Sequence, residues 1–207
     1  MGKGEGTRRQ ILLRAADLAS AEGLEVLTIG RLADVLSMSK SGLFAHFGSK
    51  EELQLAVVET AYEVFAGEVL RPAELEPAGL ARLLALLERW LGHVEHPVFR
   101  GGCFFLAASA EYDDRPGRVR DRIVALTRSW SERLSAEVAE ATGRGELRPE
   151  TNAAQLTFEL HALLHQANWA HQLHGDAAAF EHARRAMHRI LSASATAGGM
   201  RLLDHGL

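Results

Sequence analysis

The sequence contains almost none of the cysteines that cross-link small secreted proteins, and it lacks the long apolar runs that span membranes. Cys103 is the only cysteine, which excludes a disulfide framework and favours a reducing compartment. No run of about 18 apolar residues is free of charge, and the first residues lack the apolar core of a signal peptide. We therefore expect a cytoplasmic protein that makes no contact with a membrane.

Segments typical of β-strands, with alternating Val, Ile or Thr, are almost absent as well. Only five prolines occur in 207 residues, and long runs rich in Ala, Leu, Glu and Arg lie between them. These runs carry apolar residues at helical spacing, and 47% of the chain is apolar, enough for a sizeable core. The composition and the spacing together predict an all-α protein.

Lysine is scarce, and its three copies, Lys3, Lys40 and Lys50, all fall in the first 50 residues. That segment holds seven basic and five acidic residues, whereas the remainder holds sixteen basic and twenty-two acidic ones. The net charge of −4 therefore hides a slightly basic end on an acidic body. Such an asymmetry is compatible with a protein that binds DNA by one end only.

The stretch from residue 28 to residue 52 is typical of two short helices joined by a tight turn, followed by the start of a third helix. One face is apolar and is expected to be buried: Leu32, Ala33, Leu36, Leu43 and Phe47. The opposite face of the second helix is small and carries a cation at its leading end: Lys40, Ser41, Gly42, Phe44, Ala45 and His46. A surface with these properties suits insertion into the major groove of DNA, which admits one helix.

Capping residues mark the ends of these helices. Thr28 and Ser39 are expected to cap the first and second helix, and each capped N-terminus would also favour a DNA phosphate. Ser49 and Glu52 have the spacing of a capping box, which opens a long helix to about residue 70. Gly42 costs its helix roughly 1 kcal/mol relative to Ala. A close approach either to a groove wall or to another helix would explain that glycine.

A helix is also expected from Thr7 to Gly23, after a disordered start over residues 1–6. Arg8 and Arg9 project from its beginning. They form either a solvated helix end or a contact to a phosphate or the minor groove beside the second short helix.

Five further helices are predicted, over residues 80–95, 101–111, 117–142, 151–174 and 177–194, which makes about nine in total. The helix over residues 151–174 is apolar on two sides, so one side should face something outside its own domain. Paired with residues 177–194 and their symmetry mates, it would form a four-helix dimer interface. Residues 195–207 are expected to be a loose tail, on which Leu202 and Leu203 could still dock.

The first 55 residues resemble the DNA-binding head of the TetR family of bacterial transcriptional regulators. The matching positions are Thr28, Leu32, Ala33, the run from Ser39 to Phe47, and the run from Ser49 to Leu53. The resemblance implies a homodimeric repressor on a palindromic operator of double-stranded DNA, released when a small molecule enters the larger domain. It also implies DNA contacts from Thr28, Lys40, Phe44, His46 and Lys50, with Ser39 and Ser41 nearby and Gly42 on the surface that faces the bases.

Phe44 departs from the family, which commonly has Tyr at this position. The hydroxyl contact to a phosphate is therefore absent. The ring of Phe44 would either touch a thymine methyl group or pack within the protein.

The expected organisation is a helix-turn-helix DNA-binding domain of three helices over residues 1–50 and a helical ligand-binding and dimerisation domain over residues 51–207. Pockets between helices are mostly apolar, so we expect an apolar or aromatic effector. Its candidate lining residues are Tyr62, Phe65, Trp90, Phe104, Trp130, Phe158, His161 and His165. No cofactor or metal is expected. A regulator without an effector is an alternative, and a helical enzyme is a weaker one because no catalytic constellation has convincing spacing.

Two features of the larger domain stay open at this stage. His161 and His165 are four residues apart on one helical face, which suits a metal pair, the lining of a polar pocket, a dimer interface or a pair of solvated side chains. Cys103 would be a redox sensor only if its pKa were lowered, and its apolar neighbours favour an inert buried thiol instead.

Overall fold

The computed structural model describes residues 3–204, with side chains from Gly6 onward. Within this range the chain forms helices and no β-strand, which confirms the all-α prediction. None of the described helices is long and apolar enough to cross a membrane. The chain packs as two compact units, Met1–Val64 with Pro97–Thr127, and Phe65–His96 with Arg128–Leu207.

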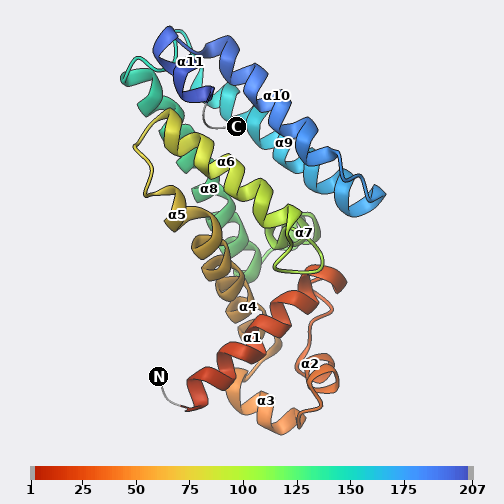
Figure 1. Ribbon diagram of the computed structural model, residues 1–207. Coiled ribbons are helices and arrows are strands. Elements are labelled where there is room, and N and C mark those ends of the chain that lie inside the picture. Colours follow the sequence, from red (N-terminus) through yellow and green to blue (C-terminus); the bar gives the residue numbers. More distant parts are fainter. Residues whose placement is uncertain (1–2, 205–207) are drawn as a thin grey trace. The chain divides into compact units, whose positions relative to one another are not determined.

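The helices follow one another along the chain as labelled in Figure 1. The α-helices are α1 (Lys3–Glu22), α2 (Ile29–Leu36), α3 (Lys40–Phe47), α4 (Lys50–Phe65), α5 (Arg71–Ala73), α6 (Leu80–Glu95), α7 (Phe104–Tyr112), α8 (Arg118–Gly143), α9 (Ala153–His174), α10 (Ala179–Ser194) and α11 (Ala197–Leu203). A single π-helical turn, η1 (Ala66–Leu70), lies between α4 and α5.

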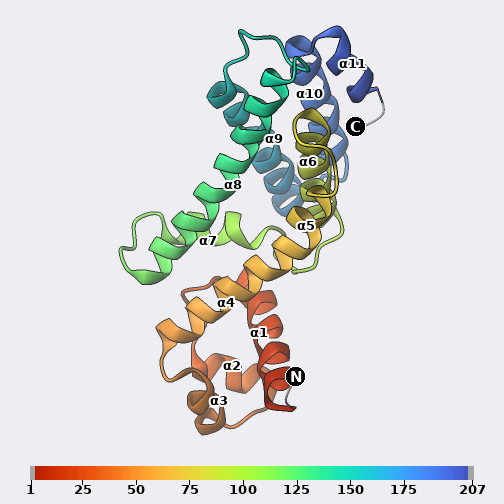
Figure 2. The same ribbon diagram turned by 90° about the vertical axis from the view of Figure 1, so that its left-hand side faces the viewer.

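The first unit has one core shared by segments far apart in the sequence. Leu32, Leu43 and Phe47 of the helix-turn-helix are buried, as their spacing predicts. The same cluster contains residues of α7, of the start of α8 and of the loop before α7: Phe99, Phe104, Ala108, Tyr112, Val119, Ile123 and Leu126. Figure 2 shows α1, α2 and α3 grouped at one end of α4. Residues 97–127 are therefore part of the support of the helix-turn-helix.

Backbone contacts fix this support to the end of α1. A Cβ atom at Gly101 would lie only 1.8 Å from the carbonyl oxygen of Ser20, so no residue larger than glycine fits there. The amide of Gly101 donates to Ser20 Oγ at 3.1 Å, and the guanidinium of Arg100 pairs with Asp17. Gly101 thus permits close packing between the loop before α7 and α1.

The second unit is organised around α6, whose residues Leu83, Leu86, Leu87 and Leu91 are fully buried. Helices α9 and α10 lie side by side over it, as Figure 1 shows in blue. Arg184 of α10 bonds to Glu88 and to Glu95 of α6, in each case at 2.8 Å. This ion-paired network and the buried leucines hold α10 on α6.

Three expectations about helix limits need correction. Helix α1 begins at Lys3 rather than at Thr7, so of the segment expected to be disordered only residues 1–2 lie outside the described range. The helix expected from Ser49 to about residue 70 instead changes to the π-helical turn η1 at Ala66 and continues into α5, which ends at Ala73. Residues 197–203 form α11 instead of a loose tail, because Leu203 docks and is completely buried. Residues 205–207 lie outside the described range.

Candidate nucleic-acid interface

The two short helices are capped as their sequence predicts. The side chain of Thr28 accepts a hydrogen bond from the amide of Arg31 at 3.0 Å, and that of Ser39 accepts one from the amide of Gly42 at 3.1 Å. Ser37 adopts the left-handed conformation, with φ of 53°, and its amide closes α2. These caps leave the N-termini of α2 and α3 with amides that favour an anion.

The outward face of α3 carries small side chains and two rings, those of Phe44 and His46. Ser41, Ala45 and His46 are exposed, and the side chain of Phe44 is 57% exposed. The Phe44 ring is therefore more than half exposed and does not belong to the buried core. A Cβ atom at Gly42 would meet only Ser39 Oγ within 4 Å, so close approach of another helix does not explain this glycine.

Lys40 lies at the leading end of this surface and close to the start of α2. A Cβ atom at Gly30 would lie 3.7 Å from Lys40 Nζ and 3.8 Å from Thr28 Oγ1. The ammonium of Lys40, the hydroxyl of Thr28 and the N-terminus of α2 therefore converge on one spot. Positive charge and free amides at one place are what a DNA phosphate requires.

Lys50 is held differently. Its Nζ lies 2.5 Å from Glu25 Oε1 in the segment between α1 and α2. The other oxygen of Glu25 accepts a hydrogen bond from the hydroxyl of Tyr112 at 3.0 Å and lies 3.8 Å from Arg115. The hydrogen bond from Lys50, assisted by that from Tyr112, lowers the pKa of Glu25, so the carboxylate stays ionised at neutral pH.

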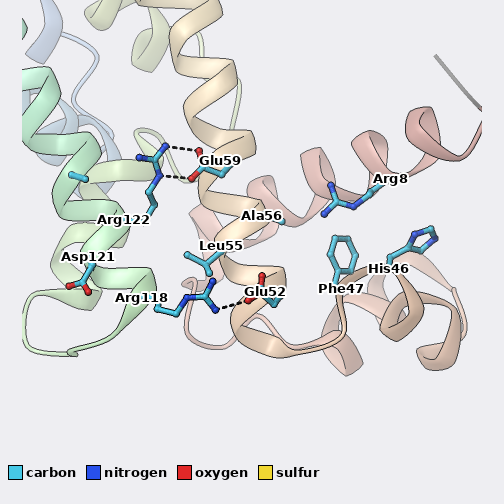
Figure 3. Close-up of a pocket in the computed structure, with 11 residues that line it drawn as sticks. Arg8, His46, Phe47, Glu52, Leu55, Ala56, Glu59, Arg118, Asp121 and Arg122 are labelled. Carbon is cyan, nitrogen blue, oxygen red and sulfur yellow. Dashed lines mark hydrogen bonds and ion pairs between the residues drawn. The ribbon is translucent and has the colours of Figure 1, made fainter.

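A groove of about 730 Å³ runs beside α3 in the first unit. Figure 3 shows Arg8, Phe47 and His46 on one side, α4 along the middle and Arg118 with Arg122 on the other side. Arg118 pairs with Glu52 at 2.6 Å, and Arg122 pairs with Glu59. The guanidinium of Arg8 stands over the Phe47 ring, 5.2 Å from its centroid, which keeps this cation beside α3.

The residues expected to line an effector pocket do not form one group. Tyr62 and Phe104 belong to the first unit, whereas Phe65, Trp90, Trp130 and the three α9 residues belong to the second. Phe65 and Trp130 meet edge to face at 5.3 Å, and Phe65 also meets His93, which the sequence did not single out. Trp130 Nε1 and His93 Nδ1 are buried without a hydrogen-bond partner among the described residues.

One outer stripe of α9 carries Phe158, His161 and His165, together with Trp169. Phe158 is 70% exposed and Trp169 is 50% exposed, while His165 is exposed between them. The rings of His161 and His165 are 4.6 Å apart, and burial together with the charge of His165 lowers the pKa of His161 to about 4. Among the described residues, no group of three metal-ligating side chains is close enough to hold a metal ion.

Cys103 is buried at the start of α7. Burial raises the pKa of its thiol to about 11, so the thiolate that a redox sensor needs is scarce at neutral pH. The thiol therefore serves as a small apolar side chain in the packing of the first unit.

Sequence reasoning missed the group around Glu25. Glu111 accepts hydrogen bonds from the amides of Leu24 and Glu25 at 2.6 and 3.0 Å, across more than 80 residues of sequence. Tyr112 follows it on α7 and reaches the Glu25 side chain. The sequence contains no motif that joins these residues, because their proximity depends on how α7 packs against the segment after α1.

An all-helical chain that presents a capped, outward-facing second helix of this kind has the architecture of a helix-turn-helix DNA-binding protein. Residues 11–57 match the family described as "Bacterial regulatory proteins, tetR family", and residues 79–187 match "Tetracyclin repressor-like, C-terminal domain". The chain belongs to the TetR family. This family consists of DNA-binding transcriptional regulators rather than enzymes.

Two curated regulators are similar to parts of the chain. TcmR of Streptomyces glaucescens is 34% identical over 116 residues, which cover 54% of this chain and 50% of TcmR. The transcriptional activator FasR of Mycolicibacterium smegmatis is 29% identical over 89 residues, which cover 43% of this chain and 41% of FasR. The chain thus spans about half or less of the length of these curated relatives.

Solved structures match over nearly the whole chain. A TetR transcriptional regulator from Chloroflexus aurantiacus is 28% identical, with a TM-score of 0.78 over 93% of this chain and 96% of that one. AibR, solved with isovaleryl coenzyme A and operator DNA, is 22% identical, with a TM-score of 0.65 over 80% of this chain and 85% of that one. At 22% identity, the likeness to AibR shows a common fold.

Proposed function

We propose that the chain is a homodimeric repressor that binds a palindromic operator through α3 and is released by a small, largely apolar effector. The observation that carries the DNA-binding half is the exposed face of α3 with Lys40 and Thr28 at its leading end. We assign base contact to Ser41, Gly42 and Phe44, and phosphate contact to Thr28, Lys40 and Lys50, with Ser39 and His46 at the edges. Residues 1–50 would read DNA, in the cytoplasm.

The dimer would form through α9 and α10, within residues 151–174 and 177–194. Phe158, Trp169 and Leu173 expose large apolar surfaces on α9 in the single chain. A second copy of the same stripe would remove them from water around a two-fold axis. We place His161 and His165 in this interface rather than in an effector pocket, because they lie on the same stripe.

The effector would bind within residues 51–207. Support comes from the cluster of the Phe65, His93 and Trp130 rings. Two buried nitrogens there have no hydrogen-bond partner within the described part of the chain, and a ligand oxygen would supply one. AibR was solved with both an acyl-coenzyme A and operator DNA, which shows that this fold accommodates ligand and DNA in one protein. A regulator without an effector is the alternative, and a broad ligand panel that never changes DNA affinity would favour it.

Replacement of Lys40 by Ala tests the DNA-binding half. DNA affinity should fall, and the plot of log binding constant against log salt should flatten by about 0.9 for each lost phosphate contact, hence by roughly two for a dimer. Binding would be measured by fluorescence anisotropy on the DNA upstream of the chain's own gene. Arg133→Ala, on α8 of the second unit, removes a cation outside the interface and should leave the slope unchanged. An unchanged slope in Lys40→Ala would remove Lys40 from the interface.

A further inference from the structure

The ammonium of Lys50 already has an anionic partner in the free protein. Glu25 Oε1 lies 2.5 Å from Lys50 Nζ, and both side chains are partly exposed, so the pair is open to solvent and to DNA. A phosphate that approaches Lys50 therefore meets a cation whose charge a carboxylate has neutralised. The nearby negative charge of Glu25 also repels the phosphate.

Glu25 is held in this position from α7. The carboxylate of Glu111 accepts the amides of Leu24 and Glu25, which fixes the backbone. The hydroxyl of Tyr112 donates to Glu25 Oε2, and burial with the neighbouring carboxylates raises the pKa of Tyr112, so the hydroxyl remains a donor. Gln54, which is buried, donates to the carbonyl oxygen of Leu24 at 2.7 Å and locks the same segment to α4.

We propose that Glu25 is a positioning residue that competes with DNA phosphate for Lys50, and that Tyr112 and Glu111 of α7 set its strength as a competitor. Arg115 lies 3.8 Å from Glu25, so Glu25 retains a cationic neighbour when Lys50 turns to DNA. Any change that draws α7 away from the segment after α1 would alter how readily Lys50 is released. This inference rests on the proposed role of Lys50 as a phosphate contact.

Glu25→Gln tests the competition, because it keeps the shape of the side chain and removes its charge. Binding to a random-sequence duplex at low salt is sufficient, since a phosphate contact is independent of sequence. We expect the affinity to rise roughly two- to fivefold for each bound subunit, the fold-change that corresponds to an exposed ion pair. Most of the rise should be lost in the Lys50→Ala background, where only the direct repulsion between Glu25 and the phosphate is relieved. Glu51→Gln is the matched control, because Glu51 is adjacent to Lys50 but pairs with Arg118.

The outcomes separate the inference from the function. An equal rise in the Lys50→Ala background, or a rise no larger than that of Glu51→Gln, would show a general charge effect and overturn the competition. A loss of affinity in Glu25→Gln would overturn it too. If Lys40→Ala weakens binding and Lys50→Ala does not, the regulator function stands and the inference falls. If the unaltered protein binds no DNA at low salt, the proposed function itself fails.

Tyr112→Phe tests the link to α7. The ring stays in the core, while Glu25 loses one hydrogen bond that orients it. We expect a rise in DNA affinity smaller than that of Glu25→Gln, and no further rise when both changes are combined. An effect of Tyr112→Phe that persists in the Glu25→Gln background would assign Tyr112 a purely structural role and remove it from the proposal.

Discussion

At the scale of single residues, Phe44 and its neighbour Leu43 face opposite surroundings on α3. Phe44 is largely exposed and Leu43 is fully buried. Phe44→Ala should therefore change the free energy of unfolding by no more than about 0.5 kcal/mol, while operator affinity falls by about 1–3 kcal/mol if the ring contacts a base. Leu43→Ala should instead cost about 2–5 kcal/mol of stability. Urea unfolding and anisotropy titrations on both variants check the contrast.

Protonation of His161 should make the free energy of unfolding depend on pH. Burial and the neighbouring His165 hold its folded-state pKa at about 4, below the ordinary value of 6.5, so the unfolded chain binds the proton first. The free energy of unfolding should therefore fall as the pH drops from 6.5 to about 4. His161→Gln should reduce this slope, and the exposed His182→Gln should not. Equal slopes in all three proteins, measured by urea unfolding across the window, would contradict the assignment.

At the scale of elements, α11 stabilises the second unit although its sequence looks like a tail. A Cβ atom at Gly199 would lie 2.1 Å from the carbonyl oxygen of Glu146, so this glycine permits close packing against the turn after α8. Leu203→Ala should reduce the free energy of unfolding by about 2–5 kcal/mol. Leu202→Ala, at a partly exposed position, should cost less than about 1 kcal/mol. Thermal and urea unfolding of both variants would separate a docked helix from a loose end.

The helices that sequence reasoning found carry either long apolar stripes, as in α6 and α8, or clear side-chain caps, as in α2 and α3. It missed α11 because two adjacent glycines, Gly198 and Gly199, are locally typical of a loop. It began α1 too late because Gly4 and Gly6 have the same local preference. In both places packing or helix propagation outweighs local propensity. The π-helical turn at Ala66 has no sequence signal.

At the scale of the whole molecule, the proposed dimer is the point most open to measurement. Phe158→Glu would place one carboxylate from each copy on the apolar α9 stripe. We expect the dimer dissociation constant to rise by at least roughly thirtyfold, which corresponds to about 2 kcal/mol, and operator binding to fall with it. Ser129→Glu, at an exposed position on α8, is the control. Sedimentation that shows an unaltered dimer in Phe158→Glu would place the interface elsewhere.

The candidate site was predictable from the sequence only where it is contiguous. The caps at Thr28 and Ser39 and the outward face of α3 follow from residues within one short stretch, whose spacing specifies their geometry. The pairing of Lys50 with Glu25 and the reach of Tyr112 depend on contacts between segments more than 20 and more than 80 residues apart. Such contacts are set by the packing of α7, which no local pattern encodes.

The backbone contact between Gly101 and Ser20 has a consequence for protein engineering. Chimeric regulators are commonly imagined as a DNA-reading segment exchanged at a single junction. Here the loop before α7 touches α1 so closely that a foreign N-terminal segment would have to reproduce the same surface at Asp17 and Ser20. A functional exchange of operator specificity should therefore transplant two separate pieces of chain, residues 1–64 together with residues 97–127, or else alter only the exposed positions of α3.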